Sequence, residues 1–192
     1  MTPEELNEAR TNPDFLKYIK EKEKESLDNK DIAQLYEVLD TLLVLDLNDE
    51  NRINKVYEEI LKISFDKIQE RLQKKEKLSL DTEDIYFIRS FYEHAVEKWS
   101  VDDYNGAKEL FFILTRIVED EFLIDIFNIH FINTSKNIDM DKFYEDVDME
   151  KEPLKESYGY FISNFNFDTK EYLDSNISLI TEEYEKLKHL LN

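Results

Sequence analysis

Glycine and proline are so scarce in this sequence that they limit the folds it can adopt. Only two glycines and three prolines occur among 192 residues. All-β folds need many tight turns, and those turns need residues that tolerate a positive φ. The scarcity therefore predicts an all-α protein with long helices and short connections. Such helices have material for a core, because apolar residues make up 41% of the chain, including 13 Phe and 11 Tyr.

Two of the prolines stand where helices are expected to begin. The segment TPEE at 2–5 has the order of N-cap, first helical residue and capping-box Glu, and Asn12-Pro13 opens a second helix. The later half of that second helix is rich in charge. We therefore expect residues 1–28 to form N-terminal helices or an arm, and residues 29–192 to form a single helical domain.

Apolar residues at helical spacing continue this pattern along the chain. Segments 31–46 and 49–76 are expected to form a helical hairpin joined at 47–49, with Asn48 capping the second helix. A terminal helix is expected over 169–191, with Asp168 as its cap. Its apolar face would consist of Leu173, Ile177, Ile180, Tyr184, Leu187 and Leu191.

Two segments fit more than one kind of secondary structure. In 121–133, apolar residues recur every four positions but also alternate, so the segment fits a buried helix or a strand, and we favour the helix. The aromatic segment 158–167 is the best remaining strand candidate. The all-α prediction therefore leaves room for one small β-hairpin within 121–167.

Residues 85–118 form the most specific unit in the sequence. Two amphipathic segments flank a short polar turn, and small and aromatic residues recur at regular places in them, namely Phe91, Ala95, Tyr104, Ala107 and Phe111. This unit resembles one tetratricopeptide repeat, a helix–turn–helix of about 34 residues. In this interpretation Ala95 and Ala107 face each other and let the two helices approach closely. Gly106 would need no unusual dihedral and would relieve crowding against the first helix.

The resemblance implies stacked helical hairpins and a role in protein binding. Segments 49–76 and 121–133 would pack before and after the unit, because one repeat cannot cover its own faces. The aromatic-rich unit is also similar to the repeat-built chaperones of bacterial secretion systems. The first helix of the unit would line a concave surface, and its candidate partner-binding residues are Tyr86, Arg89, Glu93 and Lys98. The alternative is an ordinary helical hairpin within an irregular bundle.

The net charge of the chain also indicates which kinds of partner it can bind. The chain carries a net charge of −20, with 45 acidic against 25 basic residues. Such a surface repels nucleic acid and anionic lipid, and it attracts basic proteins. We therefore expect a non-catalytic protein-interaction module, either a helical adaptor or a secretion-type chaperone. The alternative is an acidic immunity or inhibitor protein that neutralises a basic partner.

The sequence contains no constellation typical of an enzyme or a cofactor site. Without cysteine, disulfides, thiolate metal sites and cysteine nucleophiles are excluded. Glycine clusters for phosphate binding and the zinc motif H-E-x-x-H are missing. The segment 139–150 resembles a calcium loop, but Phe143 and Tyr144 occupy positions that need an oxygen ligand and a glycine. His130, on an apolar run, is expected to be a core or interface histidine. We expect no cofactor, no metal, and a cytoplasmic protein, because the first residues lack the features of a secretory signal.

Overall fold

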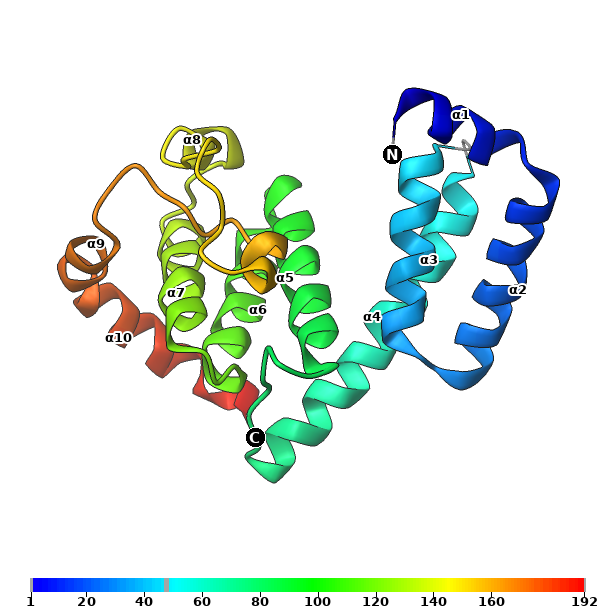
Figure 1. Ribbon diagram of the computed structural model, residues 1–192. Coiled ribbons are helices and arrows are strands. Elements are labelled where there is room, and N and C mark those ends of the chain that lie inside the picture. The colour runs from blue at the N-terminus through cyan, green and yellow to red at the C-terminus, as the bar shows by residue number, and fades with distance from the viewer. Residues whose placement is uncertain (1, 47–48, 192) are drawn as a thin grey trace. The chain divides into compact units, whose positions relative to one another are not determined.

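The computed structural model describes residues 2–46 and 49–191, and within these ranges the fold is all-α (Figure 1). The described residues form ten α-helices and two short 3₁₀ helices, and none of them belongs to a β-strand. Extended pairing in these ranges is limited to isolated bridges that join Leu78 to Val118 and Val147 to Phe165. The prediction of an all-α fold is confirmed.

The chain divides into two compact units, and the division falls after Asp66, inside helix α4. It differs from the boundary expected near residue 28, because α2 packs against α3 and belongs to the first unit. The first unit contains three helices and most of a fourth, namely α1 (Pro3–Thr11), α2 (Pro13–Asn29), α3 (Ile32–Leu45) and α4 (Glu50–Lys74).

Helix α3 supplies most of the core of the first unit. Its buried residues are Ile32, Leu35, Tyr36, Val38, Leu39, Leu42 and Leu45. Arg10 of α1 donates a hydrogen bond from Nε to the carbonyl oxygen of Leu45, which satisfies an acceptor at the end of α3. Arg52 of α4 pairs with Glu23 of α2 at 2.6 Å. Polar contacts therefore link these helices around a mainly aliphatic core.

The helix starts follow the sequence patterns closely. Thr2 and Glu5 form the expected capping box of α1, and the side chain of Asn12 caps α2. The predicted cap Asn48 lies outside the described residues. The neighbouring Asp49 accepts a hydrogen bond from the backbone N–H of Arg52 at 3.3 Å, which satisfies a donor in the first turn of α4.

The second unit begins at Lys67 and holds the rest of the helices. Its elements are α5 (Asp84–Ser100), α6 (Tyr104–Ile117), α7 (Glu121–Ser135), α8 (Met140–Tyr144), the 3₁₀ helix η1 (Glu156–Tyr160), α9 (Thr169–Ser175), α10 (Ile177–Leu187) and the 3₁₀ helix η2 (Lys188–Leu191). Figure 1 shows α5, α6 and α7 side by side, and α6 packs against both of its neighbours.

Aromatic side chains fill the core between these three helices. Trp99 of α5 and Phe111 of α6 meet edge to face at 6.1 Å, and Phe143 of α8 covers the Trp99 ring at 4.6 Å. Helix α10 packs on α6 and α7, where Lys108 and Glu183 form a largely buried ion pair at 2.8 Å. This pair lowers the pKa of Glu183. The C-terminal helix is therefore joined to the core by charge as well as by apolar contacts.

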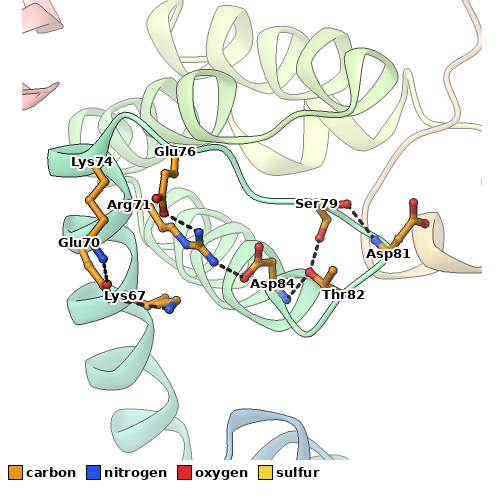
Figure 2. A network of polar contacts seen from close by, with 9 residues as sticks. All are labelled: Lys67, Glu70, Arg71, Lys74, Glu76, Ser79, Asp81, Thr82 and Asp84. Carbon is orange, nitrogen blue, oxygen red and sulfur yellow. Dashed lines mark hydrogen bonds and ion pairs between the residues drawn. The ribbon is translucent and has the colours of Figure 1, made fainter.

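A polar network connects the end of α4 to the start of α5 (Figure 2). The guanidinium of Arg71 bonds Glu76 at 2.6 Å and reaches Asp84 at 3.5 Å. The Glu76 carboxylate is the main reason that the pKa of Arg71 is raised. The same connection is bound to α6, because the backbone N–H of Leu78 donates to the carbonyl oxygen of Ile117 at 2.7 Å. We interpret this network as structural, since its charges pair with one another.

Two parts of the second unit differ from the prediction. Residues 158–167 form no strand; they continue from a 3₁₀ turn into extended backbone that pairs with 146–148 through one bridge. The terminal helix is broken at Asn176, and Ile177, expected on the buried face, is 59% exposed. The Asn176 side chain donates to the carbonyl oxygen of Tyr172 and competes with the helical hydrogen bonds there.

Candidate partner-binding site

Of the predicted partner-binding residues, Arg89 is placed most differently from expectation. It is only 8% exposed, because its guanidinium lies over the ring of Tyr160 at 4.6 Å and its Nε donates to Glu93 at 2.7 Å. Tyr86 and Lys98 are half-buried, and Lys98 pairs with Asp103 at 2.8 Å. The structure therefore brings Arg89 and Glu93 together but covers Arg89 with another part of the chain.

The covering segment consists of residues 156–165, which we call the strap. In Figure 1 its 3₁₀ helix η1 lies in front of α5. Phe161 packs edge to face on Tyr92 at 5.1 Å, and Tyr158 donates to the carboxylate of Asp120 at 2.9 Å. The strap therefore covers Arg89, one of the four residues predicted to bind a partner.

A buried chain of hydrogen bonds holds the strap to the core. The backbone N–H of Ile162 donates to the hydroxyl oxygen of Tyr92 at 2.9 Å, and that hydroxyl lies 3.1 Å from Nε2 of His130. Nδ1 of His130 lies 2.8 Å from the carbonyl oxygen of Ile126, which can only accept. Nδ1 therefore carries the ring proton, and Nε2 accepts from Tyr92.

Burial explains the titration of both side chains in this chain of hydrogen bonds. Desolvation lowers the pKa of His130 to about 4 and raises the pKa of the Tyr92 phenol. Both groups are therefore neutral at physiological pH, which suits a structural contact. The prediction that His130 is a core histidine is confirmed by its complete burial.

A pocket of about 270 Å³ opens on the outer side of the strap. The backbone of 146–148 pairs with that of 164–166 through two hydrogen bonds. The Asp148 N–H donates to the Asn164 carbonyl oxygen at 3.0 Å, and the Asn166 N–H donates to the Asp146 carbonyl oxygen at 2.9 Å. Beyond this pairing both segments contribute to the pocket, with 147–153 on one side and 159–164 on the other. Its apolar lining residues are Val147, Met149, Pro153, Tyr160, Phe161 and Ile162.

Three of the lining residues are suited to contact a bound chemical group. Met149 is 75% exposed and Tyr160 is 40% exposed, although both are large and apolar in part. Ser163 is only 7% exposed, and no hydrogen bond to another described residue uses its hydroxyl. An apolar pocket that contains one available hydroxyl can hold an apolar side chain and bond a polar group next to it.

The segment that forms one wall of this pocket is rich in acidic residues, of which Asp148 lines the pocket together with the cation Lys151. The segment 145–152 carries five carboxylates, those of Glu145, Asp146, Asp148, Glu150 and Glu152, against one cation, Lys151. In the described part of the chain, none of these carboxylates forms an ion pair, whereas ion pairs are frequent on α4 and α10. Among the residues that the structure describes, these carboxylates therefore have no cationic partner.

The sequence contained one signal for this pocket. In the segment 145–152, apolar Val147 and Met149 alternate with acids, which is typical of extended backbone with one covered face. The acidic composition of the segment fits a solvated loop equally well, so this alternation alone does not predict a pocket. The opposite wall begins at Gly159, 12 residues after Val147, so only the tertiary structure shows that the two segments meet.

Comparisons with protein-family models, with curated proteins and with solved structures find no match to this chain. Among the described residues, no group of three or more His, Cys, Asp or Glu side chains is placed to hold a metal ion. No described helix combines the length and apolar character that crossing a membrane requires. The function of this chain is therefore inferred from the geometry of the pocket.

Proposed function

We propose that this chain is a non-catalytic protein-interaction module, a helical adaptor or chaperone of the cytoplasm, that binds a partner protein through the strap pocket. The observation that supports this most is the pocket itself, with the exposed Met149 and Tyr160 beside it. Its volume of about 270 Å³ lies below the roughly 300–1,000 Å³ typical of small-molecule sites, and it suits a side chain of another protein.

The residue types around the pocket support the same function. Tyrosine is enriched among the residues that dominate binding energy at interfaces. Methionine adapts its shape to different apolar partners because its side chain is unbranched and flexible. The tetratricopeptide-like interpretation of 85–118 also implies protein binding, but the strap covers Arg89, so we place the binding surface on the strap.

The second candidate is an acidic inhibitor or immunity protein that neutralises a basic partner. It is favoured by the carboxylates of 145–152, which have no cationic partner among the described residues. In this case the surface potential would supply most of the attraction, and the pocket would contribute little. Both candidates are protein binders, and they differ in how strongly salt should weaken the complex.

The experiment is affinity capture from the native host with wild-type protein and the variant Gly159→Trp. Gly159 lines the pocket, and a Cβ added there would meet no atom within 4 Å, so a side chain can start at this position without a clash and is intended to obstruct the pocket. The matched control is Val101→Trp, because Val101 is 71% exposed in the turn after α5. Circular dichroism should give the same helical content for all three proteins.

We expect one partner to be captured by the wild type and by Val101→Trp, and to be lost with Gly159→Trp at both low and high salt. If the wild type and both variants fail to capture the partner at high salt, but Gly159→Trp still captures it at low salt, the inhibitor function is favoured. Equal capture by Gly159→Trp and Val101→Trp under both conditions would contradict a binding role for the pocket.

A further inference from the structure

Resting on the proposed function, we infer that the strap pocket binds a basic segment of a partner protein, in which one bulky apolar side chain is flanked by Lys or Arg. The pocket would hold the apolar side chain, and the acidic segment 145–152 would bind the flanking cations. The walls of the pocket support the apolar side chain, and the charge of 145–152 supports the flanking cations.

The apolar side chain of the partner segment is inferred from the walls of the pocket. Phe161 is buried, with Val147 on the other side. The hydrogen bond from Ile162 N–H to Tyr92 fixes the first wall, and the bridge to Phe165 fixes Val147. A pocket with fixed walls needs no ordering when a side chain enters, so little conformational entropy is lost there on binding. The Ser163 hydroxyl adds one hydrogen bond for a backbone group of the bound segment.

The Lys or Arg residues of the partner segment are inferred from the charge of the segment 145–152. The segment 145–152 has a net charge of −4, from five carboxylates and one lysine. Glu145, Glu150 and Glu152 are exposed, and no ion pair within the described residues uses them. An acidic or neutral segment would leave this charge uncompensated, whereas cations on the partner would pair with it and speed the encounter.

Chain geometry limits how far the cations can be from the apolar side chain. Glu150 and Glu152 follow Met149 by one and three residues, and a chain extends at most about 3.6 Å per residue. The backbones of both residues therefore lie within roughly 11 Å of the Met149 backbone. We infer that the partner's cations occur within about three residues of its apolar side chain, since an extended partner has the same rise.

The test uses a fluorescent synthetic peptide with a central leucine and lysines on both sides, and measures its binding by fluorescence anisotropy. Two comparison peptides replace the leucine with alanine or the lysines with glutamine. The protein variants are Gly159→Trp, with Val101→Trp as its control, and a charge variant with Glu145→Gln, Glu150→Gln and Glu152→Gln. The control for charge is Glu8→Gln, Glu25→Gln and Asp28→Asn, which neutralises exposed acids of the first unit.

We expect the wild type and both controls to bind the lysine–leucine peptide. The alanine peptide should bind roughly 50-fold more weakly, because about three buried carbon groups are lost. The glutamine peptide and the charge variant should each weaken binding about tenfold, the size expected from a few exposed ion pairs, and added salt should reduce this difference. Gly159→Trp should reduce binding by at least as much as the alanine peptide does.

The possible failures separate this inference from the proposed function. If the charge variant binds like its control while Gly159→Trp does not bind, the pocket is a binding site but the basic partner is wrong. If the wild type ignores the lysine–leucine peptide while capture of a host partner still depends on Gly159, the inferred partner chemistry is again wrong. If Gly159→Trp binds every peptide as Val101→Trp does, the inferred site is wrong.

Discussion

The hydroxyl of Tyr92 lies 3.1 Å from Nε2 of His130, and it also accepts the backbone N–H of Ile162 at 2.9 Å. One phenol therefore joins three elements, namely α5, α7 and the strap. Because Tyr92 and His130 are both buried, neither can exchange its partner for water without opening the core. The outer pocket depends on this contact, since Ile162 is both its wall and the strap residue held by Tyr92.

Tyr92→Phe tests this connection directly. The phenylalanine ring keeps the packing on Phe161, but the N–H of Ile162 and Nε2 of His130 lose their partner. We expect a loss of about 1–3 kcal/mol in the free energy of unfolding, as for buried polar groups left unsatisfied. Urea denaturation measures the loss, and hydrogen exchange should show faster exchange of the Ile162 amide. An unchanged unfolding midpoint together with unchanged exchange would contradict the role of the phenol.

The lowered pKa of His130 predicts a loss of stability in weak acid. Well above pH 6.5 the imidazole is neutral in both the folded and the unfolded chain, so its titration does not change stability there. As the pH falls from about 6.5 to about 4, the unfolded chain takes up a proton that the folded chain does not. The free energy of unfolding should fall by up to about 3 kcal/mol over this range.

His130→Gln is the matched variant for this pH dependence. Its amide oxygen can accept from Tyr92, but it does not titrate. Urea denaturation at several pH values should show a shallower dependence between pH 4 and 6.5 for the variant, by up to about 1.4 kcal/mol per pH unit. Equal slopes for the variant and the wild type would show that His130 does not titrate differently in the folded protein.

The sequence predicted local structure better than tertiary structure. Capping by Thr2, Asn12 and Asp168 depends on residues within three positions, and all three caps are present. The strap depends on contacts between residues 70 positions apart, such as Ile162 and Tyr92, which no local pattern contains. The same limit explains Arg89, whose helical position was predicted well but whose cover by Tyr160 was not.

The broken terminal helix shows a second limit of sequence patterns. Apolar spacing over 169–191 fits one helix, but the Asn176 side chain bonds the Tyr172 carbonyl oxygen and also accepts from Lys136 at 2.6 Å. Helix α9 thus ends where a polar side chain finds a partner in Lys136, just past the end of α7. The helical period of apolar residues does not report such contacts, because it describes only which face is buried.

Ala107→Leu tests the close packing of the α5–α6 hairpin. Ala95 and Ala107 are both fully buried, so a larger side chain at Ala107 has no free space to enter. We expect overpacking to lower the free energy of unfolding by about 1–3 kcal/mol. Asn105→Leu is the control, since Asn105 is exposed on the same helix. If thermal denaturation gives the same midpoint for the two variants, the hairpin is looser than its burial implies.

Gly106→Ala tests why a glycine occupies the first turn of α6. Gly106 does not have a positive φ, so its backbone would accept a side chain. A Cβ there would lie 2.4 Å from the carboxylate oxygen Oδ2 of Asp103 and 2.8 Å from Cδ of Lys98. Asp103 is the N-cap of α6, it accepts the Gly106 N–H at 2.9 Å, and it pairs with Lys98. The expected crowding is therefore present, and it comes mainly from the cap.

Displacing this cap should outweigh the better helix propensity of alanine. Loss of an N-cap contact costs about 0.5–2 kcal/mol, and the gain from Gly to Ala is about 0.5–1 kcal/mol in a helix interior and smaller in the first turn. We expect Gly106→Ala to destabilise the wild type by about 1 kcal/mol. In the background Asp103→Ala the cap and the clash with it are both gone, so the same change should become neutral or stabilising. Urea denaturation of the four proteins measures this reversal of sign, and a destabilisation of equal size in both backgrounds would show that the glycine is required for a reason other than the Asp103 cap.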